Sequence, residues 1–377
     1  MKKILILDHA YWYGGAEKVL VEFLKGYDRN KYDITVGVTC ESEFTKRLKE
    51  INVKYKVFPL SKEILDISRS KLSMKILSNF SEYRKMVKNI EKFTKEEKID
   101  LIFTNSMKAH IYGGQISKKT GVKAIARVHD DINNDFIKPL KLLLKNVFNN
   151  NFCHISCVSN SVRKTLIDIG VHSEKLSVLY NGITFGKPEK NIDFYRSLYN
   201  ISENDFIIGT VGWIQPRKNQ LLILKGLYPI LKNNIKLMIV GGVTEPNKNY
   251  YEKIIEYIKS KDLENNVILV GHTTDVIGHY DIMNVLIHYP ESDPLPTVLI
   301  EGIKAGKTVV ARNISGIPEI LNHHNGYLVN SIDEAKDIIF NIYKYPEKYK
   351  LNVDMEDFEK IFSYENYIKG IEELFEK

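Results

Sequence analysis

The residues from 293 to 307, Asp-Pro-Leu-Pro-Thr-Val-Leu-Ile-Glu-Gly-Ile-Lys-Ala-Gly-Lys, hold two carboxylates eight positions apart. Asp293 comes just before an expected helix, where an acid is often only a cap. Glu301 falls two turns into the apolar pattern of that helix, where a carboxylate without a partner is unfavourable. A bound polyol such as a ribose would be a partner. The segment therefore predicts a site for a sugar-containing ligand.

A second segment, residues 209–218, reads Gly-Thr-Val-Gly-Trp-Ile-Gln-Pro-Arg-Lys and follows an apolar strand pattern. Gly212 permits a turn, and Pro216 suits the first position of a helix. Arg217 and Lys218 would then bring two cations to a helix N-terminus, which already favours phosphate. The alternative is an Arg-Lys pair that is simply exposed to solvent.

Two groups in the first half of the chain suit the recognition of a phosphate or a sugar. Gly14 and Gly15 follow the first expected strand and open a helix, so amides there can point at an anion. The pair is also typical of a tight turn, and its spacing is not the Gly-x-Gly-x-x-Gly of a dinucleotide site. His129 ends the fifth expected strand, where it would donate to a sugar hydroxyl or a carbonyl. A structural histidine is an equal alternative.

Metal chemistry and nucleotide hydrolysis find little support. The chain contains no Asp-x-Asp, Gly-x-Ser-x-Gly or His-Glu-x-x-His. The Cys-His-x-x-Cys at 153–157 lies in an apolar strand pattern without a second ligand pair. Residues 301–308 stop short of an NTPase phosphate loop, because Glu301 occupies its first glycine position and Gly306 precedes a strand. We therefore expect no metal ion and no cofactor.

The elements that would position these residues alternate between β-branched runs and amphipathic segments. Strands are expected at 3–7, 33–38, 53–58, 101–104, 123–128, 154–158, 176–180, 206–211, 237–240, 267–270, 285–288 and 308–311. Helices are expected at 16–27, 75–95, 109–119, 162–169, 221–231, 250–260, 298–305 and 363–376.

This alternation predicts an α/β protein with two doubly wound, Rossmann-like domains that face each other across a cleft. A length of 377 residues is comfortable for two such domains. The periodicity breaks near 181–203, so we expect domains at 1–184 and 185–360, then a C-terminal helix at 361–377 that packs back on the first domain. Ligands of such sheets bind at the carboxyl ends of the strands, where the candidate residues lie.

Taken together, these segments resemble the family-four retaining glycosyltransferases of the GT-B fold, of the bacterial polysaccharide-biosynthesis type. The resemblance spans nearly the whole chain. Its motifs in the first half are Gly-Gly-Ala-Glu at 14–17, Arg-Val-His-Asp at 127–130 and Val-Leu-Tyr-Asn-Gly-Ile at 178–183. Its motifs in the second half are Gly-Thr-Val-Gly at 209–212, Pro-Thr-Val-Leu-Ile-Glu-Gly at 296–302 and Gly-Ile-Pro-Glu at 316–319.

The resemblance implies metal-independent transfer of a hexose or N-acetylhexosamine, with retention, from a UDP- or GDP-linked donor to a glycan or lipid-linked saccharide. Glu301 matches the acid that holds the ribose, Asp293 the acid at the hydroxyls of the donor sugar, and Lys218 the phosphate-binding lysine. His129 matches a histidine near the donor sugar, and Gly15 a loop over the leaving phosphate. The implied catalytic residues are His129, Lys218 and Asp293. The implied donor-binding residues are Gly14, Gly15, Gly212, Arg217, Lys218, Asp293, Leu295, Thr297, Val298 and Glu301.

The chain departs from the family pattern at two positions. Asp293 stands where the family usually has Glu, and Trp213 stands where it usually has Arg. Arg217 is a candidate to replace that missing cation. Both departures also support an alternative function, a non-catalytic partner subunit that keeps the fold and has lost the chemistry.

The positive charge of the chain is concentrated in its first half. Residues 1–185 hold 32 of the 54 Lys and Arg and 20 of the 47 Asp and Glu, a net +12, whereas the remainder is −5. Within it, residues 62–98 hold ten basic and six acidic residues, among them Lys71, Lys75, Arg84 and Lys85. A basic half is typical of contact with nucleic acid or an anionic membrane, but also of a merely lysine-rich composition.

With the resemblance, we expect an anionic inner-membrane surface and no nucleic acid. The apolar run at 4–7 is too short for a secretory signal, and no window has the length of a membrane span. We therefore expect a cytoplasmic protein that binds peripherally to the cytoplasmic face of the inner membrane.

Overall fold

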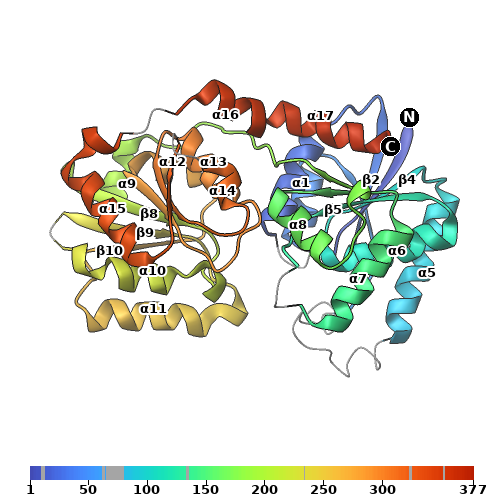
Figure 1. The fold of residues 1–377 in the computed structure, drawn as a ribbon, viewed down its shortest axis with the longest axis horizontal. Coiled ribbons are helices and arrows are strands. Elements are labelled where there is room, and N and C mark those ends of the chain that lie inside the picture. Colours follow the sequence, from blue (N-terminus) through green and yellow to red (C-terminus); the bar gives the residue numbers. More distant parts are fainter. Residues whose placement is uncertain are drawn as a thin grey trace. The chain divides into compact units, whose positions relative to one another are not determined.

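The chain forms two compact units in a computed structural model, Met1–Ile183 with Ile361–Lys377, and Thr184–Lys360. Figure 1 shows the elements of each unit, which are described separately below. The structure describes residues 1–9, 13–61, 64, 80–132, 136–232, 234–321, 325–350 and 353–377.

The first unit contains a parallel sheet of seven strands in the order β3-β2-β1-β4-β5-β6-β7. Its strands are β1 (Lys2–Leu7), β2 (Tyr32–Val38), β3 (Lys54–Val57), β4 (Leu101–Thr104), β5 (Lys123–Val128), β6 (His154–Cys157) and β7 (Leu176–Val178). The order turns at β1, where β2 and β4 lie on opposite sides and Leu7 is in register with Gly37 and Thr104. The four apolar residues that end β1 are all fully buried, as in a sheet covered on both faces.

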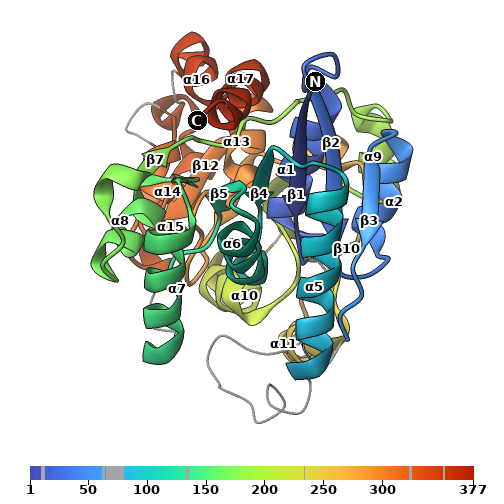
Figure 2. The same ribbon diagram turned by 90° about the vertical axis from the view of Figure 1, so that its right-hand side faces the viewer.

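Helices cover both faces of this sheet. They are α1 (Gly15–Gly26), α2 (Glu43–Glu50), α5 (Phe80–Glu96), α6 (Met107–Thr120), α7 (Lys138–Asn151), α8 (Asn160–Asp168) and α17 (Tyr364–Phe375). Helices α1, α2 and α17 share one core with β1 and β2, and α6 packs between α5 and α7 (Figure 2).

The C-terminal helix α17 belongs to the core of this first unit. The ring of Phe375 makes edge contacts with Phe23, Tyr32 and Phe103, at centroid distances of 5.3–5.6 Å. Lys2 Nζ also donates to the carbonyl of Phe375 at 2.5 Å.

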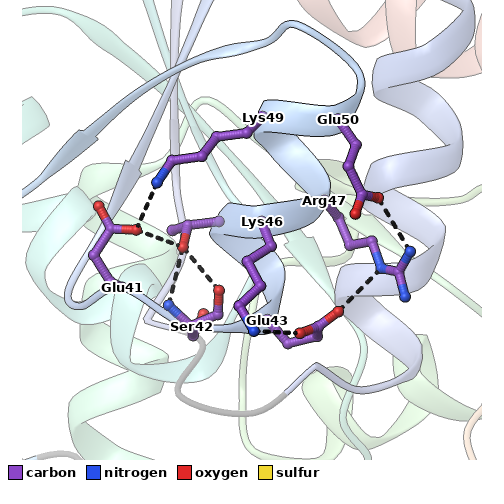
Figure 3. A network of polar contacts seen from close by, with 8 residues as sticks. Glu41, Ser42, Glu43, Lys46, Arg47, Lys49 and Glu50 are labelled. Atoms are coloured by element: carbon purple, nitrogen blue, oxygen red, sulfur yellow. Dashed lines mark hydrogen bonds and ion pairs between the residues drawn. The ribbon is translucent and has the colours of Figure 1, made fainter.

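Helix α2 is absent from the sequence expectation because it is only eight residues long and buries just Phe44, Thr45 and Leu48. Figure 3 shows how its charges pair: Glu43 contacts both Lys46 and Arg47 at 3.3 Å, and Glu41 lies 3.5 Å from Lys49. The basic residues of α2 are therefore largely neutralised by neighbouring acids.

The second unit contains a parallel sheet of six strands in the order β10-β9-β8-β11-β12-β13. Its strands are β8 (Phe206–Val211), β9 (Ile235–Val240), β10 (Val267–Gly271), β11 (Val285–His288), β12 (Thr308–Arg312) and β13 (Tyr327–Val329). Its helices are α9 (Ile192–Leu198), α10 (Gln220–Leu227), α11 (Lys248–Ser260), α12 (Val276–Ile282), α13 (Thr297–Lys304), α14 (Ile317–Ile320) and α15 (Ile332–Lys344), and α16 (Met355–Phe362) leads towards α17.

Helices α10, α11 and α15 pack on one face of this second sheet, and Figure 1 shows α12 and α13 on the other. The helix expected at 221–231 ends at Leu227, and a 3₁₀ turn (Tyr228–Ile230) follows it. Pro229 explains this end, because proline removes a helical donor and clashes with the preceding turn. The expected fold class, two doubly wound α/β domains, is confirmed.

Candidate functional site

The strand order of the second unit reverses between β8 and β11, and the loops that leave these strands carry most of the expected donor-binding residues. Parallel sheets bind ligands at such a reversal. Gly212, directly after β8, has a φ of +141°, which side-chain-bearing residues rarely adopt. Gly241, after β9, comes so close that a Cβ there would lie 1.9 Å from the carbonyl oxygen of Gly212. Both turns therefore require glycine.

Lys218, Asp293 and His288 meet at this reversal. Lys218 Nζ lies 2.5 Å from Asp293 Oδ2, and His288 Nε2 lies 2.9 Å from the same oxygen. Asp293 is 7% exposed and His288 is 2% exposed. Burial opposes ionisation of Asp293, but the Lys218 ammonium and the His288 hydrogen bond hold the pKa of its carboxyl below the usual range. The site thus keeps a carboxylate beside an ammonium, and neither contact uses Asp293 Oδ1.

Helix α13 begins at Thr297, four residues after Asp293. Thr297 and Val298 begin the helix and are half-buried, and Leu295 just before it is buried. The first amides of a helix have no partner within it and favour anions.

Glu301 has a partner within the protein, contrary to the expectation that a buried carboxylate at this position would need a bound polyol. Glu301 is 6% exposed, but the hydroxyl of buried Tyr280 donates to Glu301 Oε2 at 2.9 Å. Tyr280 therefore supplies the partner for which a polyol was expected, and the assignment of Glu301 to a ribose rests on the resemblance alone.

Arg217 and Lys218 lie in a 3₁₀ turn (Pro216–Lys218) and not in the first turn of a helix. Helix α10 begins only at Gln220, after Asn219 in the left-handed conformation, with a φ of 57°. Arg217 is exposed, and its guanidinium pairs with no residue that the structure describes. Trp213 stacks on His272 with ring centroids 5.7 Å apart, so it acts as a packing residue.

Gly14 and Gly15 form the amino end of α1 in the first unit. The amide of Gly14 donates to Glu17 Oε2 at 2.8 Å. A Cβ added at Gly15 would meet no atom of the described residues within 4 Å. Burial and the negative charge of Asp8 raise the pKa of Glu17 well above the usual range.

His129 joins a polar cluster at the carboxyl end of the first sheet. Asn105 Oδ1 lies 3.0 Å from His129 Nε2, and Asn105 Nδ2 donates to Asp8 Oδ2 at 2.8 Å. Asp8 follows β1 and Asn105 follows β4, the two strands at which the order of this sheet reverses.

Asp8, Asn105 and His288 were not among the residues expected from the sequence. Asp8 and Asn105 each follow a buried apolar strand, and His288 ends one, so the rule that places ligands at the carboxyl ends of strands would have found them. Tyr280 gave no such signal, because its contact with Glu301 joins two helices.

Comparison with known proteins defines the class. The profile of glycosyl transferases group 1 matches residues 191–358, and that of glycosyltransferase family 4 matches residues 13–186. The two matches together span most of both units. The chain belongs to the family-four glycosyltransferases of the GT-B fold.

Two curated relatives match part of the chain. The Escherichia coli UDP-Gal:alpha-D-GlcNAc-diphosphoundecaprenol alpha-1,3-galactosyltransferase is 25% identical over 261 residues, 65% of this chain and 66% of the relative. The Staphylococcus aureus capsular polysaccharide biosynthesis glycosyltransferase CapM is 28% identical over 193 residues, 48% of this chain and 50% of the relative. The chain thus spans between half and two thirds of the length of these relatives.

Solved structures show the same fold over the whole chain. Anabaena HepE in complex with UDP-glucose superposes with a TM-score of 0.86 at 21% identity, covering 100% of both chains. The lipopolysaccharide outer core galactosyltransferase WaaB, in its apo form, gives a TM-score of 0.71 at 17% identity over 99% of this chain and 98% of WaaB.

Proposed function

We propose that this protein transfers a hexose or N-acetylhexosamine from a nucleotide sugar, with retention of anomeric configuration, to a glycan or lipid-linked saccharide acceptor. The observation that carries this proposal is the buried contact between Lys218 and Asp293 at the strand reversal of the second unit. A relative that uses UDP-Gal and a fold neighbour crystallised with UDP-glucose support a nucleotide-sugar donor.

The chemistry follows from where charge develops. Breaking the bond between sugar and phosphate places negative charge on the diphosphate and positive charge on the sugar ring. Lys218 and the amides of Thr297 and Val298 are suited to stabilise the diphosphate. Asp293, with Oδ1 outside the contacts to Lys218 and His288, is suited to accept hydrogen bonds from sugar hydroxyls.

The acceptor proton needs no protein base in this scheme. As the family resemblance implies, the leaving phosphate takes the proton of the attacking hydroxyl while the sugar bond breaks. Lys218 holds that phosphate, and no metal ion takes part.

A donor screen tests the proposal. Purified protein is incubated with UDP- and GDP-linked hexoses and N-acetylhexosamines, and nucleotide release, thermal stabilisation and the anomeric configuration of the product are measured. A bound donor raises the apparent melting temperature by mass action. Binding and slow hydrolysis of one donor class are expected. Binding without turnover, restored by a co-expressed partner, would favour the non-catalytic subunit instead.

We also propose that the protein works in the cytoplasm at an anionic membrane surface. Helix α7 carries Lys138, Lys141 and Lys145 and contains no acid, and its Leu142 and Leu143 are 59% and 42% exposed. This combination suits an anionic bilayer surface. The structure shows no helix, among the residues it describes, with the length and apolar character needed to cross a membrane.

A further inference from the structure

Three polar side chains meet where the strand order of the first unit reverses. Asp8 follows β1, Asn105 follows β4 and His129 follows β5, and Leu7 is in register with Thr104 across β1 and β4. Asp8 is fully buried and Asn105 is 2% exposed, whereas His129 is half-buried. Of these three side chains, only that of His129 is therefore accessible to a ligand.

The hydrogen bonds fix the direction of each group in turn. The Asn105 amide nitrogen can only donate, and it donates to Asp8 Oδ2, so this contact orients the amide with Nδ2 towards Asp8. Asn105 Oδ1 then points at His129 Nε2 and only accepts, so the proton of the ring must lie on Nε2. The tautomer follows from this network, since hydrogens are assigned from their partners.

The histidine is neutral in this environment. Burial and the Arg127 cation lower the pKa of His129 to about 3, against the opposing charge of Asp130. A neutral imidazole protonated on Nε2 has a lone pair on Nδ1. Among the residues that the structure describes, none but Asn105 is hydrogen-bonded to the His129 ring.

We propose that Asp8 and Asn105 are positioning residues that hold His129 in its Nε2-protonated form, so that Nδ1 accepts a hydrogen bond from a hydroxyl of a bound saccharide. This inference rests on the proposed function for the identity of the ligand. It also reverses the sequence expectation that His129 donates to a hydroxyl or carbonyl. A hydroxyl can donate to Nδ1, whereas an ionised carboxylate or phosphate oxygen cannot, so this position favours a hydroxyl over an anionic oxygen.

Nuclear magnetic resonance reads the tautomer without any ligand. Long-range ¹H–¹⁵N correlation spectra of the full chain with ¹⁵N-labelled histidine, assigned with His129→Gln, report which ring nitrogen carries the proton at pH 7. We expect an Nε2-protonated His129 in the wild type. In Asp8→Asn the amides of residues 8 and 105 can pair in either direction, so we expect a measurable population protonated on Nδ1. Asn105→Ala removes the acceptor for Nε2–H, so it should also give a measurable population of His129 protonated on Nδ1.

A matched control separates this effect from general damage. Thr104 Oγ1 lies 2.7 Å from Nδ1 of His110, a second histidine, which is buried beside the same strand. Thr104→Val should lower stability and leave the His129 tautomer unchanged. An Nδ1-protonated His129 in the wild type, or an unchanged tautomer in folded Asp8→Asn and Asn105→Ala, would overturn the inference.

Turnover supplies the second measurement. With a donor found in the screen, Asp8→Asn should lower kcat/KM by about 3–10-fold, the scale of one net hydrogen bond. The loss should not add to that of His129→Gln, because both changes remove the same contact. Additive losses would contradict the positioning role. If no nucleotide sugar reacts, the proposed function fails, while the wild-type tautomer still decides the assignment of Asp8 and Asn105.

Discussion

Lys218 Nζ lies 2.5 Å from Asp293 Oδ2, although the two residues are 75 positions apart in the chain. Their loops leave β8 and β11, which become neighbours only in the folded sheet. The pair has a structural counterpart in the same unit, because Lys236 Nζ lies 2.7 Å from Asp205 Oδ2 at the opposite edge of the sheet, where β8 begins. This second pair separates the effect of losing a buried ion pair from the effect of losing a ligand contact.

Lys218→Ala should lower turnover by roughly 10²–10³, the scale of losing one group that stabilises transition-state charge. Lys236→Ala should cost comparable stability and leave turnover nearly unchanged. Steady-state kinetics and urea unfolding of both variants check this. Near-normal turnover of Lys218→Ala would contradict the phosphate assignment, and normal turnover of Arg217→Ala would show that Arg217 does not replace the cation missing at Trp213.

Glu301→Gln should weaken nucleotide binding by about 1.5–3 kcal/mol, the range for a hydrogen bond to a charged group. The amide has the same shape and can still accept from Tyr280, so the fold should persist. Calorimetric titration with UDP and GDP measures the change. Tyr280→Phe is the companion variant, since it removes the internal partner and leaves the carboxylate. If Glu301 is purely structural, both variants will lose stability while nucleotide affinity stays the same.

Acid should destabilise the first unit through His110. Burial lowers its pKa to about 3, against the charge of Asp130, whereas an unfolded histidine titrates near 6.5. Between these values the unfolded state binds more protons, so the free energy of unfolding is highest above pH 6.5 and falls as the pH is lowered. When the pH is lowered from 7 to 5, protonation of this histidine in the unfolded state lowers the free energy of unfolding by about 2 kcal/mol.

Urea unfolding of the wild type and His110→Gln at pH 7 and pH 5 measures that contribution. The variant should be less stable than the wild type at pH 7. Between pH 7 and pH 5, its free energy of unfolding should fall by about 2 kcal/mol less than that of the wild type. Equal losses in the two proteins would show that His110 is not held neutral by burial.

Chelation should leave turnover largely unchanged, because the sequence offers no Asp-x-Asp to hold a metal on a diphosphate. The test compares initial rates with and without EDTA on the donor selected by the screen. Loss of the rate, followed by recovery with Mn²⁺ or Mg²⁺, would contradict the metal-independent reaction.

Anionic liposomes should bind the 377-residue chain at low salt and release it at high salt, and neutral liposomes should not bind it. Each lysine near the surface contributes about 1 kcal/mol, so replacing Lys138, Lys141 and Lys145 by Glu should weaken flotation by at least about 100-fold. Reversal of Lys92 and Lys95 on α5 is the matched control, because these lysines already pair with Glu96 and Glu91.

The four basic residues named within 62–98 in the sequence are less informative positions for charge reversal. Lys71 and Lys75 lie outside the described residues. Arg84 and Lys85 lie on α5, a helix that also carries three acidic residues. If the wild type stays unbound at low salt, the basic excess reflects composition and a soluble acceptor becomes the better proposal.

The sequence by itself determined the layers and the main turns. Buried apolar runs such as 4–7 and 285–287 identify parallel strands, because both faces of such a strand are covered and every side chain is apolar. Gly212 was identified as a turn residue by its place after a strand, and its φ of +141° shows why glycine is needed. The short elements α2 and β13 were missed, and so were α7 and α15, although these two helices have 14 and 13 residues and are long enough to show a helical period.

Tertiary structure alone decided which polar groups touch. No local pattern links Asp8 to Asn105, Asn105 to His129 or His288 to Asp293, because these contacts depend on strand order and register. The same reason explains the correction at Glu301, whose partner Tyr280 lies on another helix. Sequence spacing gives the direction of a side chain along its own element, whereas the groups that set its charge, tautomer and availability come from elements that only folding brings together.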